Sequence, residues 1–283
     1  MAFSDSLAGP WKILNKEIIN IQQSGLSTKK GKDTKISELE KYNKPTETIA
    51  LLSQINFKKN RTKISSNNPH IASPEIIIDN DNKNIYLFFH GIIEGTIQKT
   101  KMASSKNGII FDTINKSLTA PYLKIEKVKN QYYGIAMPDL FYRLTGNFES
   151  YETREKWLLD SKTRHSDLMV DKNILYLIYT RIGNKPESIL YRKIDIDSKD
   201  WNDWKAGPEK KLLVPELEWE GANQSKEESE KGSPGELVNQ LRDPSVFKDN
   251  DGKIYLLYCG GGENGIGISE LKIKTTKQKQ YER

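Results

Sequence analysis

The sequence predicts an all-β repeat protein whose short sheets are arranged as blades around an axis. One unit recurs four times: a polar opening, a short apolar strand, a turn rich in Asp, Asn and Gly, and a strand centred on tyrosine. The chain has no long stretch of 3.6-residue apolar periodicity that would indicate a helical domain. A chain of 283 residues is long enough for one closed all-β domain with a sizeable core.

The four predicted hairpins share this layout. They cover residues 73–91, 122–134, 164–179 and 242–258. Each hairpin has a tail in which a polar turn precedes a large apolar residue. The tails are residues 104–111, 144–148, 197–204 and 265–271. Because a two-stranded hairpin cannot bury both faces, each tail is expected to supply a third strand.

A fifth tail, residues 3–11, ends in Gly9-Pro10-Trp11 and has no hairpin before it. The count therefore predicts a five-bladed β-propeller whose first blade lacks its N-terminal half, or a chain whose true start precedes Met1. We expect one propeller domain over residues 1–271. A polar insertion or flexible loop interrupts it over residues 22–68, and a basic tail follows over residues 272–283.

Composition narrows the function classes. The formal net charge is +6, but the lysines are interleaved with almost as many carboxylates, so a solvated surface is favoured over a nucleic-acid partner. The chain has no 18-residue apolar span and no signal-peptide pattern, so no membrane partner and a cytoplasmic location are expected. A single cysteine, Cys259, excludes an intrachain disulfide. The oligomeric state stays open.

Several motifs carry a resemblance that runs nearly from end to end. They are Gly9-Pro10-Trp11, Ser73-Pro74-Glu75, Arg164-His165-Ser166, Trp219-Glu220-Gly221 and Arg242-Asp243-Pro244. With them the chain resembles the five-bladed propeller superfamily of arabinanase-like and invertase-like glycoside hydrolases, of the family 43 and 32 type, and above all its uncharacterised bacterial members. The resemblance implies a central funnel lined by the first strand of each blade. Hydrolysis there needs two carboxyls across the glycosidic bond, one protonated and one ionised.

Aligning the three clearest openings tests whether these carboxyls are present. Ser73, His165 and Asp243 occupy one column, so only one of the three openings has the aspartate. Glu75 and Asp167 lie two residues further along, where strand alternation turns them to the same face. The resemblance also makes Glu220 a candidate general acid, with a surface-loop glutamate as the alternative.

All three histidines, His70, His90 and His165, fall at blade landmarks. We expect them near the funnel, although a structural role remains equally open. Their spacing has no compact ligand signature, so no metal site and no cofactor are assigned, with a central cation left open. Arg164 and Arg242 would bind an anionic sugar or pair with neighbouring acids to lock the ring.

Tryptophans divide into two groups. Trp219, with Tyr122 and Met137, would suit a platform for a sugar face. Trp11, Trp201 and Trp204 lie in tails and are expected to pack between blades.

The predicted function is that of a glycoside hydrolase-like propeller acting on the O-glycosidic bonds of a carbohydrate in the central funnel. The candidate catalytic residues are Asp243 with Glu220 or Glu75. The candidate substrate-binding residues are His70, His90, Arg164, His165, Trp219 and Arg242. The alternative is a non-catalytic carbohydrate-binding or interaction scaffold. Ser73 and His165 at aspartate-type openings favour the alternative, whereas the acid-rich, histidine-marked rim favours the enzyme.

Overall fold

The computed structural model describes residues 2–7, 9–14, 17–31, 68–95, 97–114 and 116–273. Most of the predicted insertion and of the predicted basic tail lies outside the described residues. Within them the chain is all-β apart from two short 3-10 turns, η2 (Trp201–Asp203) and η3 (Glu218–Glu220). The described residues contain no helix long and apolar enough to cross a bilayer.

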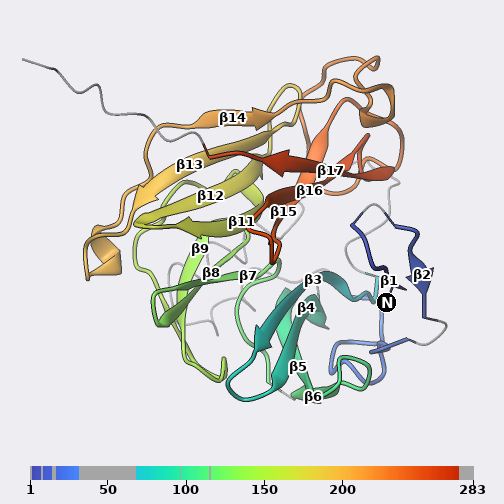
Figure 1. Ribbon diagram of the computed structural model, residues 1–283. Helices are drawn as coiled ribbons and strands as arrows, with labels where there is room; N and C mark the ends of the chain where they lie inside the picture. Colours follow the sequence, from blue (N-terminus) through green and yellow to red (C-terminus); the bar gives the residue numbers. More distant parts are fainter. Residues whose placement is uncertain are drawn as a thin grey trace, which may run out of the picture.

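Four antiparallel sheets form the blades, each running from an inner to an outer strand (Figure 1). Blade I contains β3 (Ala72–Asp79), β4 (Asn84–Glu94), β5 (Ile97–Ser105) and β6 (Asp112–Ile114). Blade II contains β7 (Lys124–Val128), β8 (Gln131–Ala136), β9 (Leu140–Leu144) and β10 (Tyr151–Thr153). Blade III contains β11 (Thr163–Asp171), β12 (Ile174–Arg181), β13 (Ile189–Asp195) and β14 (Lys210–Leu213). Blade IV contains β15 (Leu241–Lys248), β16 (Ile254–Gly260) and β17 (Gly265–Leu271).

The predicted β-propeller is therefore confirmed. The described residues form four blades and a separate two-stranded sheet, β1 (Ala2–Phe3) with β2 (Lys12–Ile13), which is consistent with an incomplete propeller, although five blades are not seen. The expected role of the tails was wrong in three blades, because only the tail 265–271 supplies a third strand. In blades I to III the tails connect the third strand to the fourth, and the large aromatic residue of the tail fills the core instead, as Phe148 and Trp201 do.

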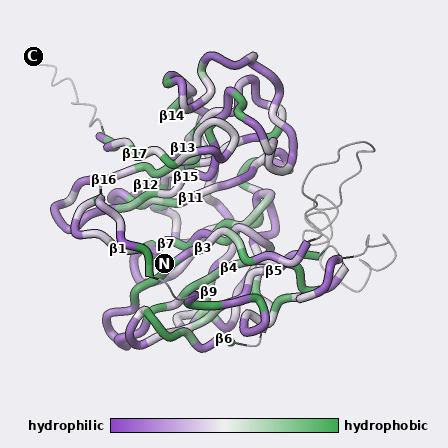
Figure 2. Tube along the Cα trace, turned by 90° about the vertical axis from the view of Figure 1, so that its right-hand side faces the viewer, coloured by the Kyte–Doolittle hydropathy of each residue, from purple (hydrophilic) through white to green (hydrophobic). Residues whose placement is uncertain are grey.

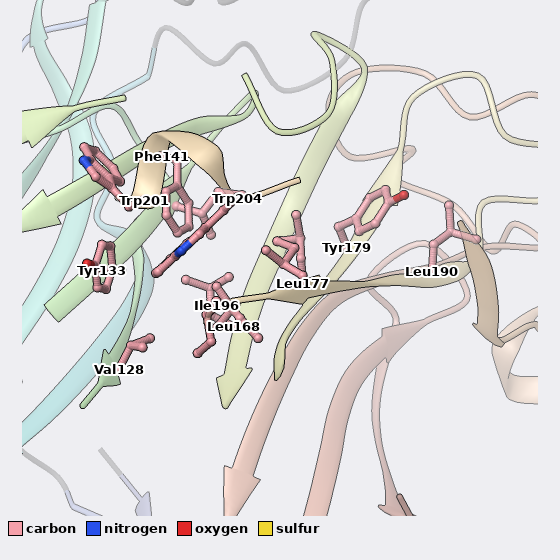
Figure 3. Packing of buried hydrophobic residues seen from close by; sticks show 13 residues of the cluster. Val128, Tyr133, Phe141, Leu168, Leu177, Tyr179, Leu190, Ile196, Trp201 and Trp204 are labelled. Atoms are coloured by element: carbon pink, nitrogen blue, oxygen red, sulfur yellow. The ribbon is translucent and has the colours of Figure 1, made fainter. Parts of the chain in front are cut away.

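The core consists of apolar layers between successive blades. Since a blade between two others buries both faces of its sheet, β12 reads as a nearly continuous apolar run, Ile174-Leu-Tyr-Leu-Ile-Tyr179. Its alternate residues pack in opposite directions, Leu177 toward blade II and Ile178 toward blade IV. Figure 3 shows the layer between blades II and III, where Trp201 and Trp204 of the connection after β13 pack beside Phe141. The expected inter-blade packing of these two tryptophans is seen.

The N-terminal segment lies between blade IV and blade I (Figure 1). Residues 18–26 pack against blade I, and residues 4–7 with Trp11 line a cavity against blade IV. Figure 2, turned by 90°, shows the hydrophobic strand β1 beside the N-terminus. Large apolar side chains of both blades stay exposed, including Ile78 of β3 and Ile266 of β17. Trp11 is also exposed, so it does not pack between blades as expected.

Candidate functional site

The same backbone position recurs in all four blades where the chain enters the inner strand. Ser73, Tyr122, His165 and Asp243 have left-handed φ values of 50°, 62°, 44° and 48°. In three of the blades the inner strand also carries a β-bulge at this position. A bulge re-aims a side chain, and left-handed backbone at a non-glycine residue costs about 1–3 kcal/mol, so such positions cluster at functional sites. The column predicted from three openings is therefore present, and Tyr122 is its fourth member. We call Ser73, Tyr122, His165 and Asp243 the opening column.

Aromatic rings connect these openings across three blades. The ring centroids of His70 and His90 lie 5.8 Å apart, those of His90 and Tyr122 4.3 Å apart, and those of Tyr122 and His165 5.0 Å apart. Burial, then the neighbouring His70 and His165, lowers the pKa of His90 to about 3, so its ring is neutral. Burial raises the pKa of the Tyr122 hydroxyl to about 12, with Asp243 adding to the effect. We call these four rings the ring row.

Asp243 ends the ring row with an ionised carboxylate. Its Oδ1 lies 2.9 Å from Nδ1 of His165. The other ring nitrogen, Nε2, lies 3.1 Å from Nη2 of Arg164. Because a guanidinium can only donate, Nε2 accepts and Nδ1 faces Asp243 with its hydrogen. Burial alone would raise the pKa of Asp243, but His165, Arg164 and Arg242 outweigh it and lower that pKa to about 2.

The two arginines behind Asp243 share one buried glutamate. Nε of Arg242 lies 2.9 Å from Oε2 of Glu187, and Nε of Arg164 lies 3.6 Å from its Oε1. Arg242 also contacts Glu263 at 3.1 Å. Each arginine donates to a backbone carbonyl as well, Arg164 to Glu230 and Arg242 to Gly232, both at 2.9 Å. Both guanidiniums are thus held by the protein itself, which matches the ring-locking alternative more closely than contact with an anionic sugar.

A second ring of polar residues lies two positions further along each inner strand: Glu75, Lys124, Asp167 and Ser245. Nζ of Lys124 lies 2.8 Å from Oε2 of Glu75 and 3.5 Å from Oγ of Ser245. Burial opposes a charge on Lys124, but Glu75 and Asp167 outweigh it and raise its pKa. The predicted acids Glu75 and Asp167 therefore both act on the charge of one lysine, Lys124, and Glu75 contacts it directly.

Three carboxylates form hydrogen bonds that join each blade to the next, and we call these the inter-blade hydrogen bonds. Glu75, Glu126 and Asp167 each accept a hydrogen bond from a backbone N–H on the inner strand of the following blade. The donors are Ile125 at 3.3 Å, Val170 at 3.3 Å and Val246 at 2.6 Å. Burial raises the pKa of both Glu75 and Glu126 to about 7, and it raises the pKa of Asp167. The inter-blade hydrogen bonds give these acids a structural role.

Glu220 and Trp219 lie in a different contact network. Oε2 of Glu220 accepts from the N–H groups of Glu216 and Leu217 at 2.7 and 2.9 Å, and Oε1 accepts from the Tyr258 hydroxyl at 2.6 Å. None of these partners contacts Asp243. The Trp219 ring stacks on Tyr258 at 6.0 Å and covers glycines of blade IV, since a Cβ at Gly260 would lie 2.6 Å from it. Direct contacts thus connect Asp243 with His165 and His165 with Arg164, and rings connect His165 with His90 and His70, whereas Glu75 contacts Lys124. Glu220 and Trp219 contact Tyr258 and their own loop instead.

No group of three or more His, Cys, Asp or Glu side chains among the described residues is arranged to hold a metal ion.

Comparison with known proteins gives fold-level similarity and one sequence relative. No family model matches the chain. It is similar to the uncharacterized protein R118 of Acanthamoeba polyphaga mimivirus, with 31% identity over 238 residues, covering 78% of this chain and 66% of that protein. The chain thus spans just under two thirds of the relative's length.

Solved structures with the same fold are carbohydrate-active enzymes. A thermostable family-43 glycoside hydrolase has 14% identity, covers 72% of each chain and superposes with a TM-score of 0.51. An endo-1,4-beta-xylanase from Bacteroides thetaiotaomicron has 18% identity, 71% and 68% coverage and a TM-score of 0.50. A beta-1,2-mannobiose phosphorylase from Listeria innocua has 12% identity, 71% coverage of each chain and a TM-score of 0.50. The fold is therefore the β-propeller shared by family-43 glycoside hydrolases.

Proposed function

We propose that the protein binds a carbohydrate at the opening column, with Asp243 as its charged anchor and Tyr122 beside it. The observation that carries this proposal is the contrast between Asp243 and the other axial acids. The Asp243 side chain is 34% exposed and ionised, whereas Glu75, Glu126 and Asp167 accept the inter-blade hydrogen bonds. An ionised carboxylate with one open side accepts strong hydrogen bonds from sugar hydroxyls.

The surroundings of Asp243 prepare it for this task. The contact with His165 and the nearby arginines keeps the carboxylate charged and restricts its orientation, which lowers the entropy cost of binding. Half-buried Tyr122 supplies an aromatic wall with a polar tip next to the carboxylate, a combination common in ligand sites. The fold-level neighbours act on xylan-type and mannose-containing carbohydrates according to their names, which supports the ligand class.

Binding without hydrolysis follows from the same contacts. Cleavage needs a second carboxyl at the scissile bond, and the predicted partner Glu220 has both oxygens occupied by Tyr258 and two backbone N–H groups. Ser73 and His165 take the places of carboxylates in the opening column. The non-catalytic alternative is therefore favoured.

Isothermal titration with a panel of neutral oligosaccharides, including xylotetraose and β-1,2-mannobiose, tests the proposal. We expect Asp243→Asn to weaken binding about tenfold or more, the loss typical of an anchoring group. Asp160→Asn is a suitable control, because that carboxylate is 46% exposed and pairs with Arg181 instead. Equal affinities of wild type and Asp243→Asn for every sugar that binds at the column would refute the proposal.

A second candidate, hydrolysis by Asp243 and Glu75, is favoured by one observation. Their pKa values are pushed apart, to about 2 and about 7, as in a base and acid pair. Turnover would then be fastest between these values and would lose its upper limb in Glu75→Gln. A pH profile of released reducing sugar distinguishes the two candidates, because the binding proposal predicts no release at any pH.

A further inference from the structure

A cavity of about 600 Å³ lies away from the axis, between the N-terminal segment and the outer face of blade IV. Asp5 and Trp11 line it from the N-terminal side. Phe247 and Asp249 near the end of β15, and Ile268 and Glu270 of β17, line it from the blade. Its size is within the range of about 300–1,000 Å³ that is usual for small-molecule sites.

The walls of this cavity expose large apolar surfaces. Trp11 is 54% exposed, Phe247 42% and Ile268 44%. Gly9, with φ +87°, lets the indole of Trp11 fold back against the backbone, because a Cβ there would lie 3.1 Å from the Trp11 ring. An open indole held in a concavity, with a second aromatic residue opposite, presents a flat face to a ligand.

Acids outnumber bases around the cavity. Its charged lining residues are Asp5, Asp249, Asp251, Glu270 and Lys253. Asp251 pairs with Lys253 at 3.0 Å, and Glu270 lies 3.6 Å from Lys272 beside the cavity. The excess of carboxylates disfavours an anionic ligand, and carboxylates accept hydrogen bonds from the hydroxyl groups of a polyhydroxylated ligand.

We propose that this cavity is a second carbohydrate-binding site, which takes a neutral oligosaccharide with one sugar face stacked on Trp11 and hydroxyls bonded to the acids of the rim. Stacking uses the apolar C–H face of the sugar ring, and the carboxylates take its equatorial hydroxyls. Its position between the N-terminal segment and blade IV makes it separate from Asp243. The inference does not depend on binding at the opening column.

Fluorescence titration tests the proposal, because a sugar on Trp11 changes the emission of that exposed indole. With the same panel including xylotetraose and β-1,2-mannobiose, we expect Trp11→Ala to weaken binding at this cavity about tenfold. Trp11→Phe keeps an aromatic face, so it should retain most of the affinity while losing the fluorescence change. Ile13→Ala is the matched control, since Ile13 is 76% exposed on the same segment but does not line the cavity.

The stoichiometry separates this site from the opening column. Wild type is expected to bind two sugars per chain, and Trp11→Ala and Asp243→Asn one each. If Trp11→Ala binds as wild type does, or if no sugar of the panel alters the emission of Trp11, the cavity proposal is overturned. Loss of binding in Trp11→Ala alone, with Asp243→Asn unaffected, would instead support the cavity and refute the opening column.

Discussion

Replacing Glu75 with glutamine tests whether a buried, protonated carboxyl joins blade I to blade II. Glu75 accepts from Ile125 N–H at 3.3 Å and faces Lys124 at 2.8 Å, and its side chain is 14% exposed. Burial raises its pKa from 4.5 to about 7 despite the lysine. A glutamine keeps the acceptor for Ile125 and cannot ionise.

The sign of the pH effect follows from the raised pKa. Folding favours the protonated form, so this contribution to stability is present below the unfolded-state pKa and is lost as the pH rises through about 7. At about 1.4 kcal/mol per pKa unit, the wild-type free energy of unfolding should lose roughly 2–3 kcal/mol through Glu75 between about pH 5 and pH 8. Glu126 adds a loss in the same direction, and that loss remains in the variant.

Urea unfolding at a series of pH values measures this difference. We expect Glu75→Gln to have a flatter dependence of unfolding free energy on pH than wild type. Glu152→Gln is the control, because the Glu152 side chain is 63% exposed and should leave the slope unchanged. Parallel wild-type and Glu75→Gln curves from pH 5 to 8 would show that Glu75 is not protonated in the folded protein.

Two further stability predictions follow from the packing. Arg242→Gln leaves the buried Glu187 with only the more distant Arg164, so it should cost about 3 kcal/mol or more in urea unfolding, whereas loss of the exposed Arg143 ion pair should cost less than about 1 kcal/mol. Equal costs would contradict the buried pairing. Gly91→Ala places a Cβ 2.2 Å from the His70 carbonyl oxygen and should lower the unfolding free energy by about 2 kcal/mol or more. Gly146→Ala meets nothing within 4 Å and should change it by less than about 0.5 kcal/mol.

The repeating turn and strand signals made the propeller predictable, because they depend on neighbours in the sequence. The same local pattern placed Ser73, His165 and Asp243 in one column. The number of blades was less predictable. A tail of polar turn plus aromatic residue has the same pattern whether it starts a strand or fills a core, as Phe148 does.

The partners of the site residues were out of reach of the sequence. Glu187 lies 55 positions before Arg242, and no local pattern marks it as the shared partner of two arginines. Lys124 lies two residues after Tyr122, as Asp167 lies two residues after His165. A lysine does not fit the acidic pattern expected at this position, so the sequence did not predict its place among the acids. The resemblance carried by Trp219-Glu220-Gly221 predicted a general acid at Glu220. The contacts of that carboxylate, with N–H groups of its own loop and with Tyr258, depend on the fold.

We propose that Asp243 anchors a sugar while the other axial acids join the blades. The most direct measurement incubates wild type and Asp243→Asn with each oligosaccharide that binds, and quantifies bound sugar and released reducing ends in the same samples. The structure predicts binding that depends on Asp243 and no release by either protein. Release by wild type that disappears in Asp243→Asn would contradict the claim and establish a hydrolase.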